Sequence, residues 1–368
     1  MASRVDAIFF YFCASKFSTM SETIFFLCFL ALIIFLLAMD LGVFHKKDKE
    51  VTFKESAMWT GVWVALALAF FVFIRCEGNL IHNVHDNESL VEISQKYHED
   101  LAVSTDAPFE ENLKAYKKNL ALEYITGYAM EETLSIDNIF VMIMILMSFG
   151  VEKKYYHRVL FYGILGAIVL RFLFIFAAAA LIQKFHWILF IFGGILIYSG
   201  VKMFLERNKE ERIDVENHFV VKFLTKRKLS VPYFDGHNFF TKVDSRWLCT
   251  PLFIVLVIIE LSDIVFAFDS VPAVFSVTND PYIVFFSNIF AIMGLRSLFF
   301  MLESVLDKFW FLKIGLSILL TFIGVKMLLP LIHLHIGTVV SLCVILGILS
   351  LSIVISLLFP KKRLETLD

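Results

Sequence analysis

The sequence predicts an all-α, polytopic membrane protein of about nine transmembrane helices, and its composition and the spacing of its apolar runs are the observations that predict it. Of the 368 residues, 59% are hydrophobic and 18% are charged, and the mean hydropathy is +0.77. An ordinary soluble domain carries about a quarter charged residues. A bilayer-spanning helix needs roughly 20 apolar residues. The segments that qualify are residues 23–43, 57–75, 119–149, 157–182, 186–205, 248–277, 282–303, 309–329 and 335–359.

These segments follow one another through nearly the whole chain, so we expect a single transmembrane domain over residues 21–360. Residues 1–20 are expected to form an N-terminal extension, because the apolar stretch from Ala7 to Cys13 is too short to span a bilayer. The five cysteines are scattered and include no Cys-x-x-Cys pair, which argues against a disulfide framework or a thiolate metal site. A net charge of −2 gives no indication of a basic surface for nucleic acid.

The two long links between spans differ in their basic residues, and this difference predicts the orientation of the chain in the membrane. The link over residues 76–117 carries Lys96, Lys114 and Lys117. The link over residues 206–247 carries nine lysines and arginines. Because positive residues stay on the cytoplasmic side, we expect 206–247 to be a cytoplasmic loop and 76–117 an extracytoplasmic loop. With nine spans, the N-terminus then lies outside and the C-terminus in the cytoplasm.

Short sequence matches predict an inverted repeat. Gly-Val-Lys-Met occurs at residues 200–203 and again at 324–327. We therefore pair repeat A, about residues 119–205, with repeat B, about residues 248–329. Since each copy holds three spans, the second copy must cross the membrane in the opposite sense, and transporters with such a three-plus-three helix repeat bind substrate between the copies near the bilayer midplane. Chance matches in Phe/Leu/Ile-rich sequence are the alternative.

Acidic residues lie within the apolar spans, where a charge is costly, and six of them are candidate site residues. An aspartate at the bilayer centre costs roughly 2.5–3.5 kcal/mol on the insertion scale. These side chains are therefore expected to face the bundle interior, to stay neutral or to bind a positive group. The acids of the two predicted copies have matching intervals, Glu131 to Asp137 and Asp263 to Asp269. The six residues are Asp40, Glu131, Asp137, Glu260, Asp263 and Asp269.

Helix geometry indicates which of these polar groups share a face. Residues seven apart return to within about 20° of one another around a straight helix, whereas residues six apart lie about 120° away. Glu131 is thus expected to share a face with Asn138, with Ser135 close by. Asp263 is expected to share a face with Ser270 in the same way.

Pro272 predicts that the sixth span is not straight. It cannot donate a hydrogen bond to the carbonyl of Phe268, so that oxygen is expected to be free next to Asp269. Carboxylate, amide, hydroxyl and carbonyl oxygens form a hard site that suits Mg²⁺, Ca²⁺ or Mn²⁺. The predicted metal ligands are Glu131, Asp137, Asn138, Glu260, Asp263, Asp269 and Asp40, with Ser135, Ser270, Arg171, Arg296 and Pro272 in supporting positions.

The alternative is that the membrane acids pair with basic residues and only fix helix packing. Arg171, Arg296, Lys202 and Lys326 all lie within predicted spans and could neutralise some of the acids. Four basic residues against six acids would leave a surplus of negative charge.

The extracytoplasmic loop contains a polar cluster near its start. His82, His85 and Asp86 lie beside Glu77 and Glu88. These groups could gather cations at the exit of a pathway. A loop of this polarity is more often simply solvated.

Several longer motifs resemble the TerC family of membrane proteins. Residues 131–138 are similar to the first acidic motif of that family, and residues 260–272 to its second. The other matching stretches are Asp40 to His45, Phe53 to Glu55, Trp59 to Trp63, His157 to Leu160 and Ser287 to Ala291. The resemblance covers residues 21–330. It implies a nine-span protein of the bacterial inner membrane that exports manganese, with the acids of the third and sixth spans in the metal path.

Two other functions stay open at this point. A membrane partner that delivers metal to exported metalloenzymes, or that scaffolds a membrane complex, needs no flux of its own. An intramembrane aspartyl protease needs paired aspartates that activate water, but no Gly-x-Gly-Asp sequence precedes either acidic motif. We therefore expect a transporter and not an enzyme. Its expected partners are the lipid bilayer and a divalent metal ion, with Mn²⁺ as the transported ion and no tightly bound cofactor.

Overall fold

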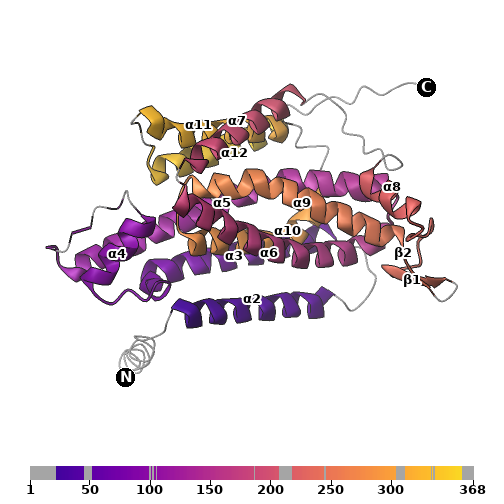
Figure 1. Ribbon diagram of the computed structural model, residues 1–368, viewed down its shortest axis with the longest axis horizontal. Coiled ribbons are helices and arrows are strands. Elements are labelled where there is room, and N and C mark those ends of the chain that lie inside the picture. The colour runs from indigo at the N-terminus through magenta and orange to yellow at the C-terminus, as the bar shows by residue number, and fades with distance from the viewer. Residues whose placement is uncertain are drawn as a thin grey trace.

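The computed structural model is a bundle of long helices (Figure 1). The structure describes residues 22–44, 52–98, 101, 103–104, 106–185, 187–206, 218–243, 246–303, 311–332, 334 and 336–358, without the side chains of residues 40–44 and 312–313. The predicted N-terminal extension, residues 1–20, lies outside the described residues.

Long helices coincide with all the predicted spans. They are α2 (Glu22–Phe44), α3 (Phe53–Glu77), α5 (Phe109–Ser148), α6 (Lys153–Lys184), α7 (Ile188–Leu205), α9 (Pro251–Phe275), α10 (Pro281–Glu303), α11 (Leu312–Leu328) and α12 (Thr338–Leu358). Within the described residues, 8 helices are long and apolar enough to cross a membrane. Helix α5 is not among them, because Glu131, Glu132 and Asp137 interrupt its apolar half. The prediction of an all-α polytopic membrane protein is confirmed.

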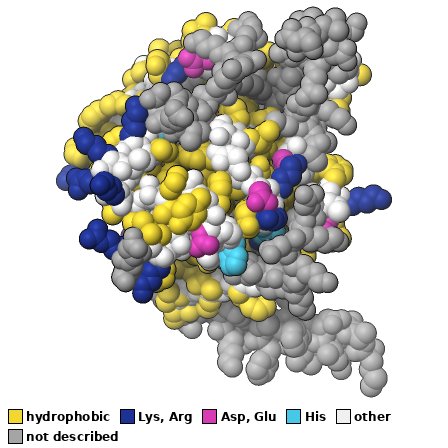
Figure 2. All heavy atoms as spheres, turned by 90° about the vertical axis from the view of Figure 1, so that its right-hand side faces the viewer, with side chains coloured by type: hydrophobic (Ala, Val, Ile, Leu, Met, Phe, Trp, Pro, Cys, Tyr) yellow, Lys and Arg dark blue, Asp and Glu magenta, His cyan; other side chains and the backbone are white. Residues whose placement is uncertain are grey.

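The two long links fold into short elements at opposite ends of the bundle (Figure 1). At one end lie η1 (Gly78–Leu80) and α4 (Asn87–Tyr97), and at the other lie α8 (Phe219–Lys226) and an antiparallel pair of strands, β1 (Phe240–Val243) and β2 (Arg246–Cys249). A further short turn, η3 (Leu329–Ile332), follows α11. Figure 2 faces the strand end and shows many lysine and arginine side chains along it. Which end faces the cytoplasm stays a prediction.

Helix α10 forms the centre of the bundle. Its most apolar stretch of 18 residues is entirely buried, and α3, α5 and α6 are among the helices that cover it. A helix that is apolar on all sides is expected to be buried in this way. Helix α2 packs on α10 through aromatic rings, with the centroids of Phe29 and Phe286 4.4 Å apart. The outer surfaces of α2 and α6 expose large apolar side chains such as Phe35 and Leu173, as helices in contact with lipid do.

Helices α7 and α11 approach each other more closely than most side chains allow. A Cβ added at Gly200 would lie 2.7 Å from the carbonyl oxygen of Ser317, and one added at Gly324 would lie 2.6 Å from the carbonyl oxygen of Gly193. Small residues permit such close backbone contact between membrane helices. Gly200 and Gly324 are the first residues of the two Gly-Val-Lys-Met matches, so the matched glycines make mirrored contacts.

The helices of repeat A and repeat B also pack in the pairs that a two-fold axis between the two repeats would produce. Helix α5 packs against α10, and the corresponding helices of the opposite copies, α9 and α6, also pack together. Helix α7 packs against its counterpart α11. These contacts support the inverted repeat of residues 119–205 and 248–329, which stays a prediction.

Candidate cation site

Helices α5 and α9 carry the two acidic motifs and pack against each other inside the bundle. Helix α9 also contacts α6 and α7, and α5 also contacts α10 and α11. Because residues six apart on a helix point about 120° apart, the two matched acids of each motif face different neighbours: Glu131 and Asp137 in the first motif, Asp263 and Asp269 in the second. The site therefore has two parts, which are described in turn.

Arg171 of α6 is fully buried between the two motifs. Its guanidinium forms ion pairs with Glu131 of α5 and with Asp263 of α9, the latter at 3.2 Å between Nη2 and Oδ1. Nη1 donates to Ser270 Oγ at 3.2 Å and to Asn288 Oδ1 at 2.7 Å. We call these five residues the arginine cluster. A buried carboxylate is costly unless it is paired, and the cluster supplies that pairing.

The arginine cluster separates the two interpretations of the membrane acids. Glu131 and Asp263 both pair with a membrane arginine, as the alternative predicts. Their place in a metal path stays a prediction. Asp263 and Ser270 contact the same guanidinium, so the prediction that they share a helix face is confirmed.

The second acids of the two motifs, Asp137 and Asp269, line one small cavity of about 30 Å³. We call it the central cavity. Asn138 and Ser270 contribute to its wall, so each motif supplies an aspartate and the polar residue that follows it. The rest of the wall is apolar and comes from α5, α7, α9 and α11: Leu134, Met203, Phe266, Leu316 and Leu320. None of the described lining residues is basic. Ser199 of α7 donates a hydrogen bond to Asp269 at 2.9 Å between Oγ and Oδ1.

Some polar atoms next to the central cavity have unused hydrogen-bonding capacity. Asn138 is 3% exposed, and its Nδ2 has no hydrogen-bond partner. The buried Ser135 Oγ has none either. A space of about 10–15 Å³ or more can hold one water molecule if polar partners surround it. The central cavity is therefore large enough for a water or a single ion and offers carboxylate, amide and hydroxyl oxygens.

The predicted metal ligands do not all meet. Among the described residues, no three His, Cys, Asp and Glu side chains are close enough to hold a metal ion. Glu260 lies on the α6 side, where with Asp263 it lines a separate cavity of about 10 Å³ next to Gly163. Its Oε2 is buried without a hydrogen-bond partner. Asp40 lies within α2, but its side chain is outside the described residues.

Two predicted supporting residues lie away from the central cavity. Arg296 of α10 is buried, and its Nη1 lies 3.4 Å from His157 Nδ1 on α6. Pro272 is also buried, in the last turn of α9, and this helix continues to Phe275. The helix continues past the proline, while the bend in this span and the unpaired carbonyl at Phe268 stay predictions.

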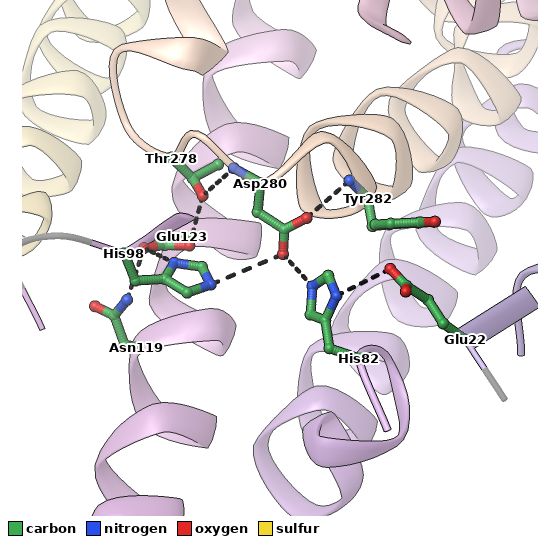
Figure 3. A network of polar contacts seen from close by, with 8 residues as sticks. All are labelled: Glu22, His82, His98, Asn119, Glu123, Thr278, Asp280 and Tyr282. Atoms are coloured by element: carbon green, nitrogen blue, oxygen red, sulfur yellow. Dashed lines mark hydrogen bonds and ion pairs between the residues drawn. The ribbon is translucent and has the colours of Figure 1, made fainter. Parts of the chain in front are cut away.

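The sequence did not predict a buried polar network at the α4 end of the bundle (Figure 3). We call Glu22, His82, His98, Glu123 and Asp280 the histidine network. His82 Nε2 lies 2.8 Å from Asp280 Oδ2, and its Nδ1 lies 3.2 Å from Glu22 Oε1. His98 Nδ1 lies 3.0 Å from Glu123 Oε1. Figure 3 shows the Asp280 carboxylate between the two imidazole rings.

Electrostatics in the histidine network favour charged side chains. Burial opposes protonation of His82, but the Asp280 and Glu22 carboxylates outweigh it and raise the pKa of His82 to about 9. Burial also opposes protonation of His98, yet Glu123 raises its pKa. In Asp280, burial opposes ionisation and the two imidazoles lower the pKa below its usual value.

A sequence signal for this network was partly visible. The sequence places His82 with His85 and Asp86 in one polar cluster of the loop. His85 and Asp86 are indeed exposed, whereas His82 is only 6% exposed. Asp280 directly precedes Pro281 at the start of α10 and accepts a hydrogen bond from Tyr282 N at 2.9 Å, which is typical of a helix N-terminus.

Comparison with known proteins places the chain among bacterial membrane proteins. Residues 116–364 match the family described as "Integral membrane protein TerC family". The chain is 43% identical over 330 residues to the "Uncharacterized membrane protein STKORF319" of Myxococcus xanthus, which covers 90% of this chain and 91% of that protein. It is 36% identical over 334 residues to the "Putative membrane-bound redox modulator Alx" of Escherichia coli (strain K12), with 89% and 92% covered. No solved structure gives a significant match.

Proposed function

Because the chain belongs to the TerC family of integral membrane proteins, we propose that it moves divalent cations across the bacterial inner membrane through the central cavity, with export of Mn²⁺ as its main activity. The observation that carries this proposal is that Asp137 and Asp269, one from each acidic motif, line the same small cavity between α5, α7, α9 and α11. Ionisable residues inside a membrane mark ion pathways when they face the bundle interior. The choice of Mn²⁺ and the outward direction rest on the resemblance to the family.

The donor set suits a cation that binds and leaves again. The two aspartates would offset the charge of a divalent ion, and the oxygens of Asn138 and Ser270 would complete part of its coordination. Calcium sites take six to eight oxygen ligands, and magnesium usually keeps several of its waters. A site with two carboxylates would leave most of the remaining positions to water, so binding would be weak enough for release.

The arginine cluster has a supporting task in this proposal. Arg171 joins α6 to α5 through Glu131 and to α9 through Asp263. Through Asn288 it also joins α10. The helices around the central cavity are thus tied together at a point where the acids are neutralised, and Asp137 and Asp269 lie at the cavity where the cation would bind.

A flux measurement with matched variants tests the proposal. Purified protein in liposomes is expected to carry Mn²⁺, and Asp137→Asn or Asp269→Asn is expected to lower the initial rate by at least about tenfold, since a change of 1.4 kcal/mol in binding already gives that factor. Asp106→Asn, at an exposed aspartate, is the matched control and should keep the wild-type rate. Unchanged flux in both cavity variants would contradict the proposal. Parallel assays with Mg²⁺ and Ca²⁺ measure selectivity.

The remaining alternatives give different outcomes in the same preparation. A metal-delivery partner or scaffold should give no flux by itself, in any variant. An intramembrane aspartyl protease would use the same two aspartates, but the central cavity of about 30 Å³ has no room for a peptide. The relative in Escherichia coli is described as a putative redox modulator, and cysteines would be the redox-active side chains of such an activity. The described cysteines are all free and lie on four different elements: Cys28, Cys76, Cys249 and Cys343.

A further inference from the structure

A second, larger cavity lies at the α4 end of the bundle, next to the histidine network. Its volume is about 390 Å³, and its wall includes the ends of α5, α7, α9, α11 and α12. We call it the vestibule. Its polar lining includes His98, Glu123, Thr278 and Lys326. The histidine network therefore has the His98–Glu123 pair on the vestibule, the buried His82 and Asp280 behind it, and the partly exposed Glu22 at its far end.

The groups at this wall are held in a defined arrangement. Thr278 Oγ1 donates to Glu123 Oε2 at 2.6 Å, and Asn119 Nδ2 donates to Glu123 Oε1 at 2.6 Å. The ring of His98 is 3% exposed, and its Nε2 has no hydrogen bond and lies 3.9 Å from Asp280 Oδ2. Because His98 is one of the residues that line the vestibule and an imidazole can titrate near neutral pH, His98 is the group through which the network can exchange a proton with water there.

The same helices connect the vestibule to the central cavity. Helix α5 carries both Glu123 and Asp137, which at 1.5 Å per residue lie roughly 20 Å apart along its axis. Helix α9 carries Asp269 and leads directly to Thr278 and Asp280. A cation that passes between the central cavity and the α4 end would therefore pass the His98–Glu123 pair.

We infer that the histidine network is a proton-exchange site that couples cation movement to proton movement in the opposite direction. This inference rests on the proposed function. A divalent cation in the vestibule repels the positive imidazolium of His98, which releases its proton from nitrogen to vestibule water and becomes neutral. His82 then passes its proton by way of Asp280 to the neutral His98 and becomes neutral itself. His98 releases this second proton to vestibule water. Two protons released balance the two charges of one cation.

The surroundings of the two histidines favour this role over simple solvation. The charged or titratable groups that face them are Glu22, Tyr97, Tyr116, Glu123, Asp280 and Tyr282, with Lys326 on the vestibule wall. Three of these groups are carboxylates that stabilise the protonated rings, so the network holds its protons until another positive charge arrives. The raised pKa values of His82 and His98 agree with this order of events.

Proton movement in proteoliposomes tests the inference. Vesicles with a pH-sensitive dye inside receive a Mn²⁺ gradient, and dye signal and Mn²⁺ uptake are recorded together. Wild type is expected to move up to two protons outward for each Mn²⁺ that enters. His98→Gln and His82→Gln should lose this counterflow, because glutamine keeps a hydrogen bond but does not titrate. His85→Gln changes an exposed histidine of the same loop and should behave as wild type.

The outcomes separate this inference from the proposed function. Mn²⁺ uptake by wild type without proton counterflow would overturn the inference alone, and this result does not depend on how any variant folds. Equal counterflow in wild type, His98→Gln and His82→Gln would overturn it as well. Absence of Mn²⁺ uptake by wild type would overturn the proposed function and the inference together. An imposed proton gradient that speeds Mn²⁺ uptake in wild type but not in His98→Gln would support the inference.

Discussion

The arginine cluster and the central cavity use the same two motifs in different ways. In each motif the first acid, Glu131 or Asp263, pairs with Arg171. The second acid, Asp137 or Asp269, lines a cavity whose described lining includes no basic residue. The helical rotation between the two positions turns one acid toward α6 and the other toward α7 and α11. The comparison teaches that acidic residues in one membrane motif can divide into a set that pairs with an arginine and a set that lines a cavity.

The largest expected effect is that of Arg171→Met, which tests the structural role of the arginine cluster. It leaves two buried carboxylates without their cation, and removing one partner of a buried ion pair costs about 3–5 kcal/mol. We expect a large loss of folded protein in the membrane and a lower unfolding temperature in detergent. Adding Glu131→Gln and Asp263→Asn to Arg171→Met should recover much of the stability. No recovery would mean that pairing of these charges is not what Arg171 supplies.

The second prediction extends the comparison to the histidine network, where the positive partner can titrate. The pKa of His82 is raised from 6.5 to about 9, so its stabilisation is fully present below pH 6.5 and is lost as the pH rises through 9. The free energy involved is on the order of 3 kcal/mol. The unfolding temperature of wild type should fall from pH 6.5 to 9.5. In His82→Gln it should start lower and change less, and a slope equal to that of wild type would contradict the assignment.

The third prediction compares matched aspartates of one helix. Asp263→Asn removes a charge-assisted hydrogen bond in the arginine cluster and should lower the free energy of unfolding by about 1.5–3 kcal/mol. Asp269→Asn keeps an oxygen that can accept from Ser199 and should change it by less than about 1 kcal/mol. Thermal unfolding of both purified variants measures the difference. If Asp269→Asn proves the more destabilised of the two, the division into two sets fails.

The smallest expected effect concerns Ser199, whose hydroxyl joins α7 to Asp269. Ser199→Ala removes one hydrogen bond and should lower the free energy of unfolding by about 1 kcal/mol. The same thermal measurement applies, with Ser262→Ala on α9 as control, since that hydroxyl bonds only the backbone of its own helix. A loss as large as that of Arg171→Met would show that Asp269 is as structural as Asp263.

The sequence predicted the fold class and the position of every span, because long apolar runs leave few alternatives to membrane helices. Helix periodicity also predicted that Asp263 and Ser270 share a face, which their common contact with Arg171 confirms. For Glu131 and Asp263 it left two options open, a metal and an arginine. Only the position of α6 in the fold shows that both acids pair with Arg171.

The histidine network could not be predicted in the same way. Its members come from α2, from the segment after η1, from the end of α4, from α5 and from the link before α10. No periodic pattern relates residues on five separate elements, and contacts between them depend on how the helix ends pack. That Asp137 and Asp269 line one cavity depends likewise on how α5 and α9 pack, which a single helical wheel does not show.

The backbone contact between α7 and α11 limits how the molecule can change shape. Two helices that touch at Gly193, Gly200 and Gly324 have no side-chain layer that would let one slide past the other. The two helices should therefore move together as one rigid body. Since α7 and α11 both line the central cavity and the vestibule, a tilt of this helix pair would narrow or widen both cavities at once.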